Sequence, residues 1–388
     1  MSDLIDIFGG HFMSALPNPY TRFRQLRDEE PVKAVDLPMG PGYLVTRYED
    51  VLTVLRDPTL FSSRANAKGI GLVMGRTILE MDGKEHSRHR NLVSLAFVPK
   101  ALGGSLPATV ERIAHELLDA FARDGQADLV EQFTKTFPLR VIAHIIGVPI
   151  QDYDAFQRWS LAVIGLGSDP AAAFEAAEAL VAYLRPIVAD RQAAAQDDLL
   201  STLAHADVDG HRLSDEEIFG FLKLLLPAGA ETTYRLLGNT LFALLHNVQQ
   251  FDAVRADRSQ IRWAIEETLR WESPVQLASR EATSVTHLGG IELASGSQVL
   301  TCLGAANRDE RHYPEPDRFD VARHADDHVA FGFGRHFCLG SHLARLEATT
   351  ALNALFDRLP NLRLDPAQSC GVYGFAFRSP DRLPVRFG

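Results

Sequence analysis

The chain has 388 residues, of which 46% are hydrophobic and 23% are charged. It can therefore bury a large core, and this composition excludes disordered and fibrous proteins. Lysine and arginine number 39 and aspartate and glutamate 50, a net charge of −11, and such a negative surface argues against general binding to nucleic acids or anionic membranes because it repels phosphate.

The sequence carries no signal of export or membrane insertion. Uninterrupted apolar runs of about 18 residues are absent, and the N-terminus, MSDLIDIFGG, has neither a basic segment nor an apolar segment of the secretory type. The three cysteines, Cys302, Cys338 and Cys370, are too few and too far apart for a disulfide framework or a zinc ribbon. We therefore expect a cytoplasmic protein in which each cysteine has its own explanation.

Hydrophobic periodicity predicts a mainly α protein with a small β region. The expected helices are 19–29, 48–56, 84–97, 107–123, 128–146, 151–165, 171–195, 214–246, 248–256, 259–271 and 341–357. Alternating apolar residues predict short strands at 32–35, 43–46, 281–285, 298–303 and 372–377. Residues 304–331 are predicted to form a long irregular loop, and such loops are usually functional.

The helix predicted at 214–246 carries an unusual central segment. Ser214 and Glu217 form a capping box before an apolar run that predicts burial. Pro227 removes one backbone hydrogen bond and should kink the helix. Residues 228–233, AGAETT, then bring small residues, an acid and hydroxyls into an apolar environment. From the residues alone, either a functional acid or an ordinary buried ion pair with back-bonded threonines fits this pattern.

The most informative loop contains Cys338. Residues 331–340, FGFGRHFCLG, combine three glycines with three phenylalanines directly before the helix predicted at 341–357, and glycines let a backbone approach a bulky, flat group. A helix N-terminus lowers the pKa of a thiol and favours the thiolate needed in a metal ligand or a nucleophile. Three readings stay open on this basis: a metal ligand, a nucleophile with His336 as its base, and an inert buried cysteine, which is the default for Cys302 and Cys370.

FGFGRHFCLG resembles the haem-ligand loop of the cytochrome P450 family, and AGAETT resembles the family's oxygen-activation motif. The resemblance implies haem b with the Cys338 thiolate as the iron ligand, which favours O–O cleavage. It implies further that Thr232 holds dioxygen and a water while Glu231 gates protons from solvent. The expected fold is the cytochrome P450 fold, as a single haem domain over residues 1–388 without a fused reductase.

The resemblance also implies the remaining cofactor and scaffold contacts. Residues expected to line the haem are Ala228, Phe331, Gly332 and Gly340. Residues expected to bind its propionates are His86, Arg90, Arg280 and His336, although residues 82–90 taken alone fit a solvated charged helix face better. The family's structural Glu-Arg-Arg network is expected at Glu267, Arg270 and Arg318, where the sequence alone indicates only an ordinary i, i+3 helix pair.

The implied function is that of a monooxygenase that inserts one oxygen atom from O₂ into a hydrophobic small molecule by hydroxylation or epoxidation. Electrons would come from NAD(P)H through a separate reductase and ferredoxin, which a basic patch of Arg88, Arg335 and Arg345 would bind. The expected substrate contacts, mostly apolar, are Val73, Leu225, Val275, Leu277 and Phe375, with Gln276 as an orienting polar group. The alternatives are a haem-thiolate sensor without turnover and a peroxide-driven peroxygenase, and we expect a monomer.

Overall fold

The computed structural model describes residues 7, 16–37, 40–94, 97, 103–149, 153–167, 169–208 and 210–388. The α-helices within these ranges are α2 (Tyr20–Glu29), α3 (Tyr48–Arg56), α4 (Gly71–Met74), α5 (Gly83–Ser94), α7 (Leu106–Asp119), α8 (Thr136–Ile146), α9 (Tyr153–Ile164), α10 (Pro170–Ala193), α11 (Leu199–His205), α12 (Asp215–His246), α13 (Val248–Ala256), α14 (Ile261–Trp271), α15 (Leu303–Ala306) and α16 (Ser341–Arg358).

The main sheet has five strands in the order β1-β2-β10-β7-β3. These strands are β1 (Val32–Leu37), β2 (Gly40–Val45), β3 (Phe61–Ser62), β7 (Leu277–Ala282) and β10 (Gln298–Cys302). β10 is parallel to β2, with Val299 opposite Tyr43, and antiparallel to β7, with Val299 opposite Arg280. Smaller sheets are built from β4 (Gln126–Asp128), β5 (Asp207–Val208), β6 (His211–Arg212), β8 (Thr286–Leu288), β9 (Ile291–Leu293), β11 (Arg363–Leu364), β12 (Val372–Tyr373), β13 (Ser379–Pro380) and β14 (Pro384–Arg386).

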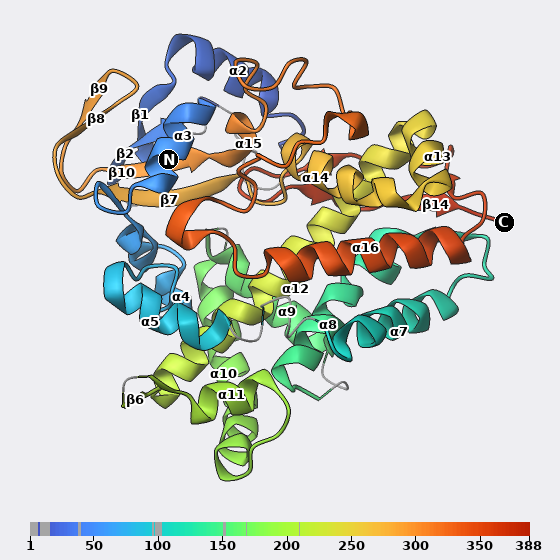
Figure 1. The fold of residues 1–388 in the computed structure, drawn as a ribbon, viewed down its shortest axis with the longest axis horizontal. Helices are drawn as coiled ribbons and strands as arrows, with labels where there is room; N and C mark the ends of the chain where they lie inside the picture. Colours follow the sequence, from blue (N-terminus) through green and yellow to red (C-terminus); the bar gives the residue numbers. More distant parts are fainter. Residues whose placement is uncertain are drawn as a thin grey trace.

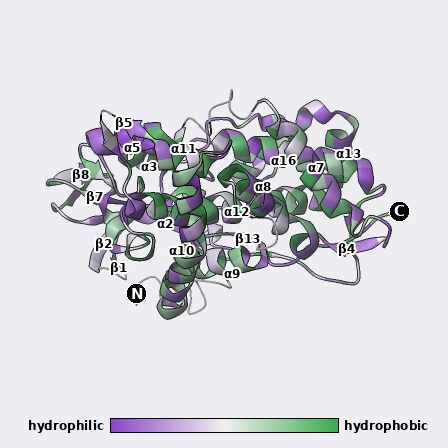
Figure 2. Cartoon of the chain, turned by 90° about the horizontal axis from the view of Figure 1, so that it is seen from below, coloured by the Kyte–Doolittle hydropathy of each residue, from purple (hydrophilic) through white to green (hydrophobic). Residues whose placement is uncertain are grey.

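The sheet, with α2 and α3, forms one end of the molecule, and the long helices α10, α12 and α16 form the rest (Figure 1). α12 lies in the middle and packs against α8, α9, α14 and α16. Its capping box is present, because the Ser214 hydroxyl accepts from the Glu217 N–H and the Glu217 carboxylate accepts from the Ser214 N–H. Apolar residues dominate α12 and α8, whereas α5 is hydrophilic (Figure 2).

α12 and α8 approach each other closely at Gly229. A Cβ on this residue would lie 2.8 Å from the side chain of Ile142, so a larger residue would push the two helices apart. The helix continues without interruption through Pro227, so the proline does not end it. α12 and α16 pack against each other, and Figure 1 shows α12 crossing behind the start of α16.

Most predicted elements are present, and the differences have local causes. The strand predicted at 281–285 instead spans β7 (Leu277–Ala282), where it pairs with β10. The predicted loop at 304–331 begins as α15, and the predicted helix at 128–146 is divided into a π-helical turn, Val130–Thr134, and α8. The short helices α4 and α11 were not predicted, because a single turn or two gives little periodicity. Residues 151 and 152, where the helix predicted at 151–165 begins, lie outside the described residues.

Within the part of the chain that the structure describes, every helix is too short or too polar to cross a membrane.

Candidate active site

The Cys338 loop is held by its own backbone. The Cys338 N–H donates to the Phe331 carbonyl at 2.8 Å, and the Phe337 N–H donates to the Gly334 carbonyl at 3.1 Å. Gly332 and Gly334 have φ angles of +70° and +71°, which side chains with a Cβ rarely adopt. A Cβ on Gly334 would also lie 2.9 Å from the Leu55 carbonyl. The glycines therefore let the loop fold back under the end of α3.

Cys338 directly precedes α16, whose N-cap is Gly340. Burial raises the pKa of the Cys338 thiol above its ordinary value, although the Gly340 N–H and the guanidiniums of Arg90 and Arg345 act in the opposite direction. The helix terminus lowers this pKa in the predicted direction, through the Gly340 N–H, but in the protein alone desolvation outweighs it. A thiolate here requires a cation, and a coordinated metal deprotonates a thiol outright.

One face of α12 is open at the middle of the helix. Ala228 is exposed and Thr232 half-buried, although the helix around them is almost entirely buried. Leu225 lies on the same face, since it precedes Thr232 by seven residues, about two helical turns. The Thr232 hydroxyl donates to the Ala228 carbonyl at 2.7 Å. The middle of α12 therefore presents a small methyl and a hydroxyl where a neighbouring flat group would fit.

Glu231 is buried beside this opening and is only 2% exposed. Its Oε2 has no hydrogen-bond partner among the described residues and lies 3.6 Å from the Arg235 guanidinium. Burial raises the pKa of Glu231 to about 7, against the opposing effects of Arg235 and Lys135. An acid with this pKa exchanges its proton readily near neutral pH.

The four residues predicted to bind propionates gather around Asp82. The His86 and His336 rings lie 4.1 Å apart between centroids, and the His336 Nε2 is 3.5 Å from the Asp82 carboxylate. Arg90 donates to the Phe337 carbonyl at 2.6 Å. Arg280 is 7% exposed and has the Asp82 charge in its surroundings.

This cluster has more buried donors than acceptors. The His86 Nε2 is buried without a hydrogen-bond partner in the described parts of the chain, and Arg280 donates only to the carbonyl of Ser279. Burial, together with the neighbouring His336 and Arg90 charges, lowers the pKa of His86 to about 4. A buried cation and an orphaned imidazole nitrogen fit an anionic group such as a propionate. These residues, the exposed Ala228 and the glycine-rich loop together fit haem.

Comparison with known proteins settles the family. The family description of cytochrome P450 matches residues 151–366. The chain is 37% identical to cytochrome P450 107B1 of Saccharopolyspora erythraea over 98% of this chain and 97% of that protein. The chain belongs to the cytochrome P450 family. It is also 38% identical to the vitamin D(3) 25-hydroxylase of Pseudonocardia autotrophica, over 99% and 96% of the two chains.

Solved structures of cytochromes P450 are also similar to this chain. Cytochrome P450 CYP109Q5 from Chondromyces apiculatus superposes with a TM-score of 0.87 at 36% identity, covering 96% of this chain and 95% of that one. P450BioI, solved with a fatty-acyl carrier protein, gives a TM-score of 0.88 at 32% identity, covering 96% and 99%. The fold is therefore the P450 fold, and the protein is a P450 monooxygenase, a family whose members bind haem through a cysteine thiolate.

The buried Glu-Arg pair of this P450 is present, but its third member differs from the prediction. Arg270 and Glu267 are 0% exposed and joined by two hydrogen bonds of 2.8 and 2.7 Å. Arg323, in the short turn Val321–Arg323, lies 3.4 Å from Glu267. The prediction of Arg318 was wrong, because its side chain is 60% exposed and pairs with Glu315 and Asp320.

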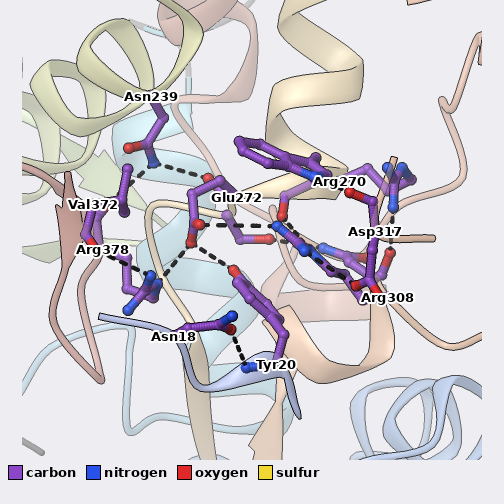
Figure 3. Close-up of polar contacts among 12 residues, drawn as sticks. Asn18, Tyr20, Asn239, Arg270, Glu272, Arg308, Asp317, Val372 and Arg378 are labelled. Carbon is purple, nitrogen blue, oxygen red and sulfur yellow. Dashed lines mark hydrogen bonds and ion pairs between the residues drawn. The ribbon is translucent and has the colours of Figure 1, made fainter. Parts of the chain in front are cut away.

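A second buried network was not predicted (Figure 3). Glu272, directly after α14, accepts from the Tyr20 hydroxyl at 2.5 Å and from the Arg378 Nε at 2.7 Å. The Arg308 guanidinium lies 3.6 Å above the Tyr20 ring and 3.9 Å from Glu272. Asn239 of α12 donates to the carbonyls of Glu272 and Arg378. A lone arginine in the stretch 374–380, GFAFRSP, was the available signal.

The residues predicted to contact substrate do not form one group. Val275 and Leu277 are half-buried and lead into β7, and Leu225 is on the Thr232 face of α12. Phe375 is 3% exposed and belongs to an apolar cluster with Tyr20 and Phe23, apart from the main core. Its predicted substrate contact does not fit this position. The Gln276 amide is fully buried and donates to Ser273 and Tyr20, so it is part of the second network and does not orient substrate.

Val73 lines a cavity between α4, α10 and α12 instead of the Thr232 face. It lies in α4 and is 4% exposed.

The three arginines of the predicted basic patch differ in their surroundings. Arg88 and Arg335 are exposed, and no ion pair involves either of them in the described ranges. Arg345 is half-buried, is held by Glu266 at 2.5 and 2.8 Å and lies 4.6 Å from the Phe331 ring centroid. The role of all three in binding an electron donor stays a prediction.

Proposed function

We propose that this P450 inserts one oxygen atom from O₂ into a hydrophobic small organic molecule, by hydroxylation or epoxidation. The observation that carries the proposal is the pairing, on adjacent positions of α12, of a half-buried hydroxyl at Thr232 with a buried acid at Glu231 whose pKa is about 7. A monooxygenase must deliver protons in a controlled way, whereas a sensor without turnover has no need of such a pair.

In the proposed mechanism, one set of residues binds haem and another moves protons. Cys338 is the proposed iron ligand, and His86, Arg90, Arg280 and His336 are the proposed propionate ligands. Bound haem supplies the iron at which O₂ is reduced and cleaved, with electron density from the thiolate. Phe331, Gly332, Gly340 and Ala228 are proposed to line its two faces.

Thr232 and Glu231 are the proposed catalytic residues. The Thr232 hydroxyl can rotate from the Ala228 carbonyl to hold a water in the opening, since a hydroxyl both donates and accepts. Glu231 takes a proton from solvent and passes it on, and the Arg235 guanidinium beside it is held by a 3.0 Å hydrogen bond to the buried Ser379 hydroxyl. The Glu231 carboxyl is half protonated near neutral pH, so both directions of transfer are available.

The substrate is proposed to be apolar. Leu225, on the Thr232 face of α12, and Val275 and Leu277, at the start of β7, are the buried or half-buried apolar side chains that we propose to contact it, and apolar surfaces bind by burial. Two similar proteins carry names or ligands in keeping with this, namely the vitamin D(3) 25-hydroxylase and CYP109E1 of Bacillus megaterium, solved with testosterone.

Electrons are proposed to come from NAD(P)H through a reductase and a ferredoxin. Arg88 and Arg335, together with Arg56, form an exposed basic surface around the Cys338 loop, and Arg56 lies 5.2 Å from the ring centroid of the exposed Phe333. An acidic electron carrier is complementary to such a surface. We propose further that the protein works as a monomer in the cytosol.

Thr232→Ala tests the proposed function. In the reconstituted enzyme the variant should keep its haem and its consumption of NAD(P)H, while most electrons appear as hydrogen peroxide instead of product. Thr233→Ala is the matched control, because Thr233 is 3% exposed and lies on another side of α12. Unchanged coupling of product to NAD(P)H in Thr232→Ala would overturn the role of the hydroxyl.

The Soret band of the ferric enzyme identifies the substrate class. Titration with terpenes, steroids, fatty acids and small aromatics should give a low-to-high-spin shift with an apolar class, because a bound substrate would change the surroundings of the haem iron. Turnover with peroxide alone, at a rate equal to that with electron donors, would favour the peroxygenase alternative.

A further inference from the structure

A cavity of about 360 Å³ lies between α4, α10 and α12. Its apolar walls come from Val73, Phe174, Ala177, Val181 and Ala182, and its charged residues are Glu178, Arg185 and Lys223. The volume lies within the range of small-molecule sites. Phe174 in the wall and Leu72 beside Val73 are large apolar residues that are 45% and 59% exposed, so the cavity has an apolar rim.

Lys223 is a charged residue in an otherwise apolar segment of α12. It is the one charged residue in the segment 218–226, IFGFLKLLL, and its side chain is half-buried. Its ammonium donates to the Val73 carbonyl at 3.1 Å, and no carboxylate in the described residues forms an ion pair with it. Burial lowers the pKa of Lys223. An ammonium has three donors, so two stay available to a ligand in the cavity.

Arg185 supplies the second cation. It lies on α10, and its guanidinium lies 5.2 Å from the centroid of the Phe219 ring on α12, which holds the side chain across the gap between the two helices. Glu178 is on the same face of α10, two helical turns before Arg185, and within the described structure it forms no ion pair with either cation. The cavity therefore holds two cations and one carboxylate around apolar walls.

The cavity lies on the far side of α12 from the proposed catalytic face. Lys223 precedes Thr232 by nine residues, which is about two and a half helical turns and places the two side chains on opposite sides of the helix. Leu225, by contrast, lies on the Thr232 side. A ligand bound at Lys223 would therefore contact α4, α10 and the outer face of α12.

We propose that this cavity is a second ligand site that binds an amphipathic carboxylate, with the carboxylate on Lys223 and Arg185 and the apolar chain against Val73 and Val181. The Glu216 charge acts on Lys223 without forming an ion pair with it in the described structure, so such a ligand would give Lys223 a direct acidic partner and would cover the exposed Phe174. The inference depends on the cavity alone and not on the reaction proposed above.

Calorimetry with the holoenzyme and decanoate tests the site in the presence of saturating imidazole, which occupies the haem iron. Decanoate should bind with imidazole present, and Lys223→Met should weaken binding ten-fold or more, because it removes a charged hydrogen-bond donor to the carboxylate. Lys223→Arg should retain affinity. Decanol, which lacks the charge, should bind equally to the wild type and to Lys223→Met.

Lys84→Met is the matched control, because Lys84 is exposed and does not line the cavity. It should bind decanoate like the wild type. Loss of decanoate binding on adding imidazole would place the carboxylate at the haem and overturn the proposal. Equal affinities of the wild type, Lys223→Met and Arg185→Met would overturn it as well. All variants must carry the same haem content, so a folding defect is recognised directly.

Discussion

Two buried carboxylates of this protein have opposite surroundings. Glu272, at the end of α14, is 3% exposed and accepts hydrogen bonds from Tyr20 and Arg378. Glu231, in the middle of α12, is 2% exposed, and its Oε2 has no hydrogen bond in the described structure. Burial is the same in both cases, so the number of fixed donors makes the difference between a structural charge and one that exchanges protons.

The arginines beside Glu272 and Glu231 differ in the same way, in how many of their hydrogen-bond donors are used. All five N–H donors of Arg378 are used, by Glu272 and by the carbonyls of Leu16, Pro17, Val372 and Gly374. Arg235 is bound to Ser379 and lies 3.6 Å from Glu231. A fully used guanidinium fixes its surroundings, whereas a loosely held one leaves its partner acid free to titrate.

Arg378→Met should have the largest effect. It removes five hydrogen bonds and leaves the buried Glu272 charge without its closest cation, which costs about 3–5 kcal/mol. Urea unfolding should show this loss, with reduced haem retention. Arg382→Met, at an exposed position on the same segment, should be close to the wild type. Equal stability of the two variants would show that Glu272 does not depend on Arg378.

Glu231→Gln should change how stability depends on pH. The folded pKa of about 7 lies above the ordinary 4.5, so the protonated acid favours the folded state at low pH. This contribution is lost as pH rises from 4.5 through about 7, and amounts to about 3 kcal/mol. Unfolding at pH 5 and pH 8 should therefore show a smaller difference in the variant. An unchanged pH dependence of stability in Glu231→Gln would contradict the difference that we draw between Glu231 and Glu272.

Arg323→Ala and Arg318→Ala should separate the third network residue from its neighbour. Arg323 lies beside the fully buried Glu267, and its removal should cost about 1–3 kcal/mol. The ion pairs of Arg318 are exposed, and its removal should cost less than about 1 kcal/mol. Thermal unfolding ranks the two. A larger loss for Arg318 would restore the original prediction.

Arg88→Glu changes an exposed charge, in contrast to the buried ones above, and should have the smallest effect on stability. Arg88 is exposed and forms no ion pair among the described residues, so charge reversal should slow reduction by a ferredoxin several-fold and weaken its salt dependence, while unfolding stays unchanged. Glu49→Gln is a control at an exposed acidic position that is not part of the proposed docking surface. Stopped-flow reduction that is insensitive to the variant and to salt would remove Arg88 from the docking surface.

The fold and the central site were predictable because their signals are contiguous. The Cys338 loop, the capping box at Ser214 and the acid and hydroxyl at 231 and 232 each occupy a few adjacent residues. The partners in the two buried networks were not predictable, because only the path of the folded chain brings these residues together. Arg323 replaces Arg318 through a tight turn, and Glu272 and Arg378 are separated by 106 residues. The local effect of the Gly340 N–H on the Cys338 pKa was predictable, whereas the desolvation that outweighs it depends on the whole fold.

The five hydrogen bonds of Arg378 also order the events of biosynthesis. Its bond to the Leu16 carbonyl joins positions 362 residues apart, and closing so long a loop is entropically costly and slow. A growing chain that has not yet reached Arg378 leaves Glu272 without its main cation and the segment at Leu16 and Pro17 without its donors. This junction can therefore form only after residue 378 has been synthesised.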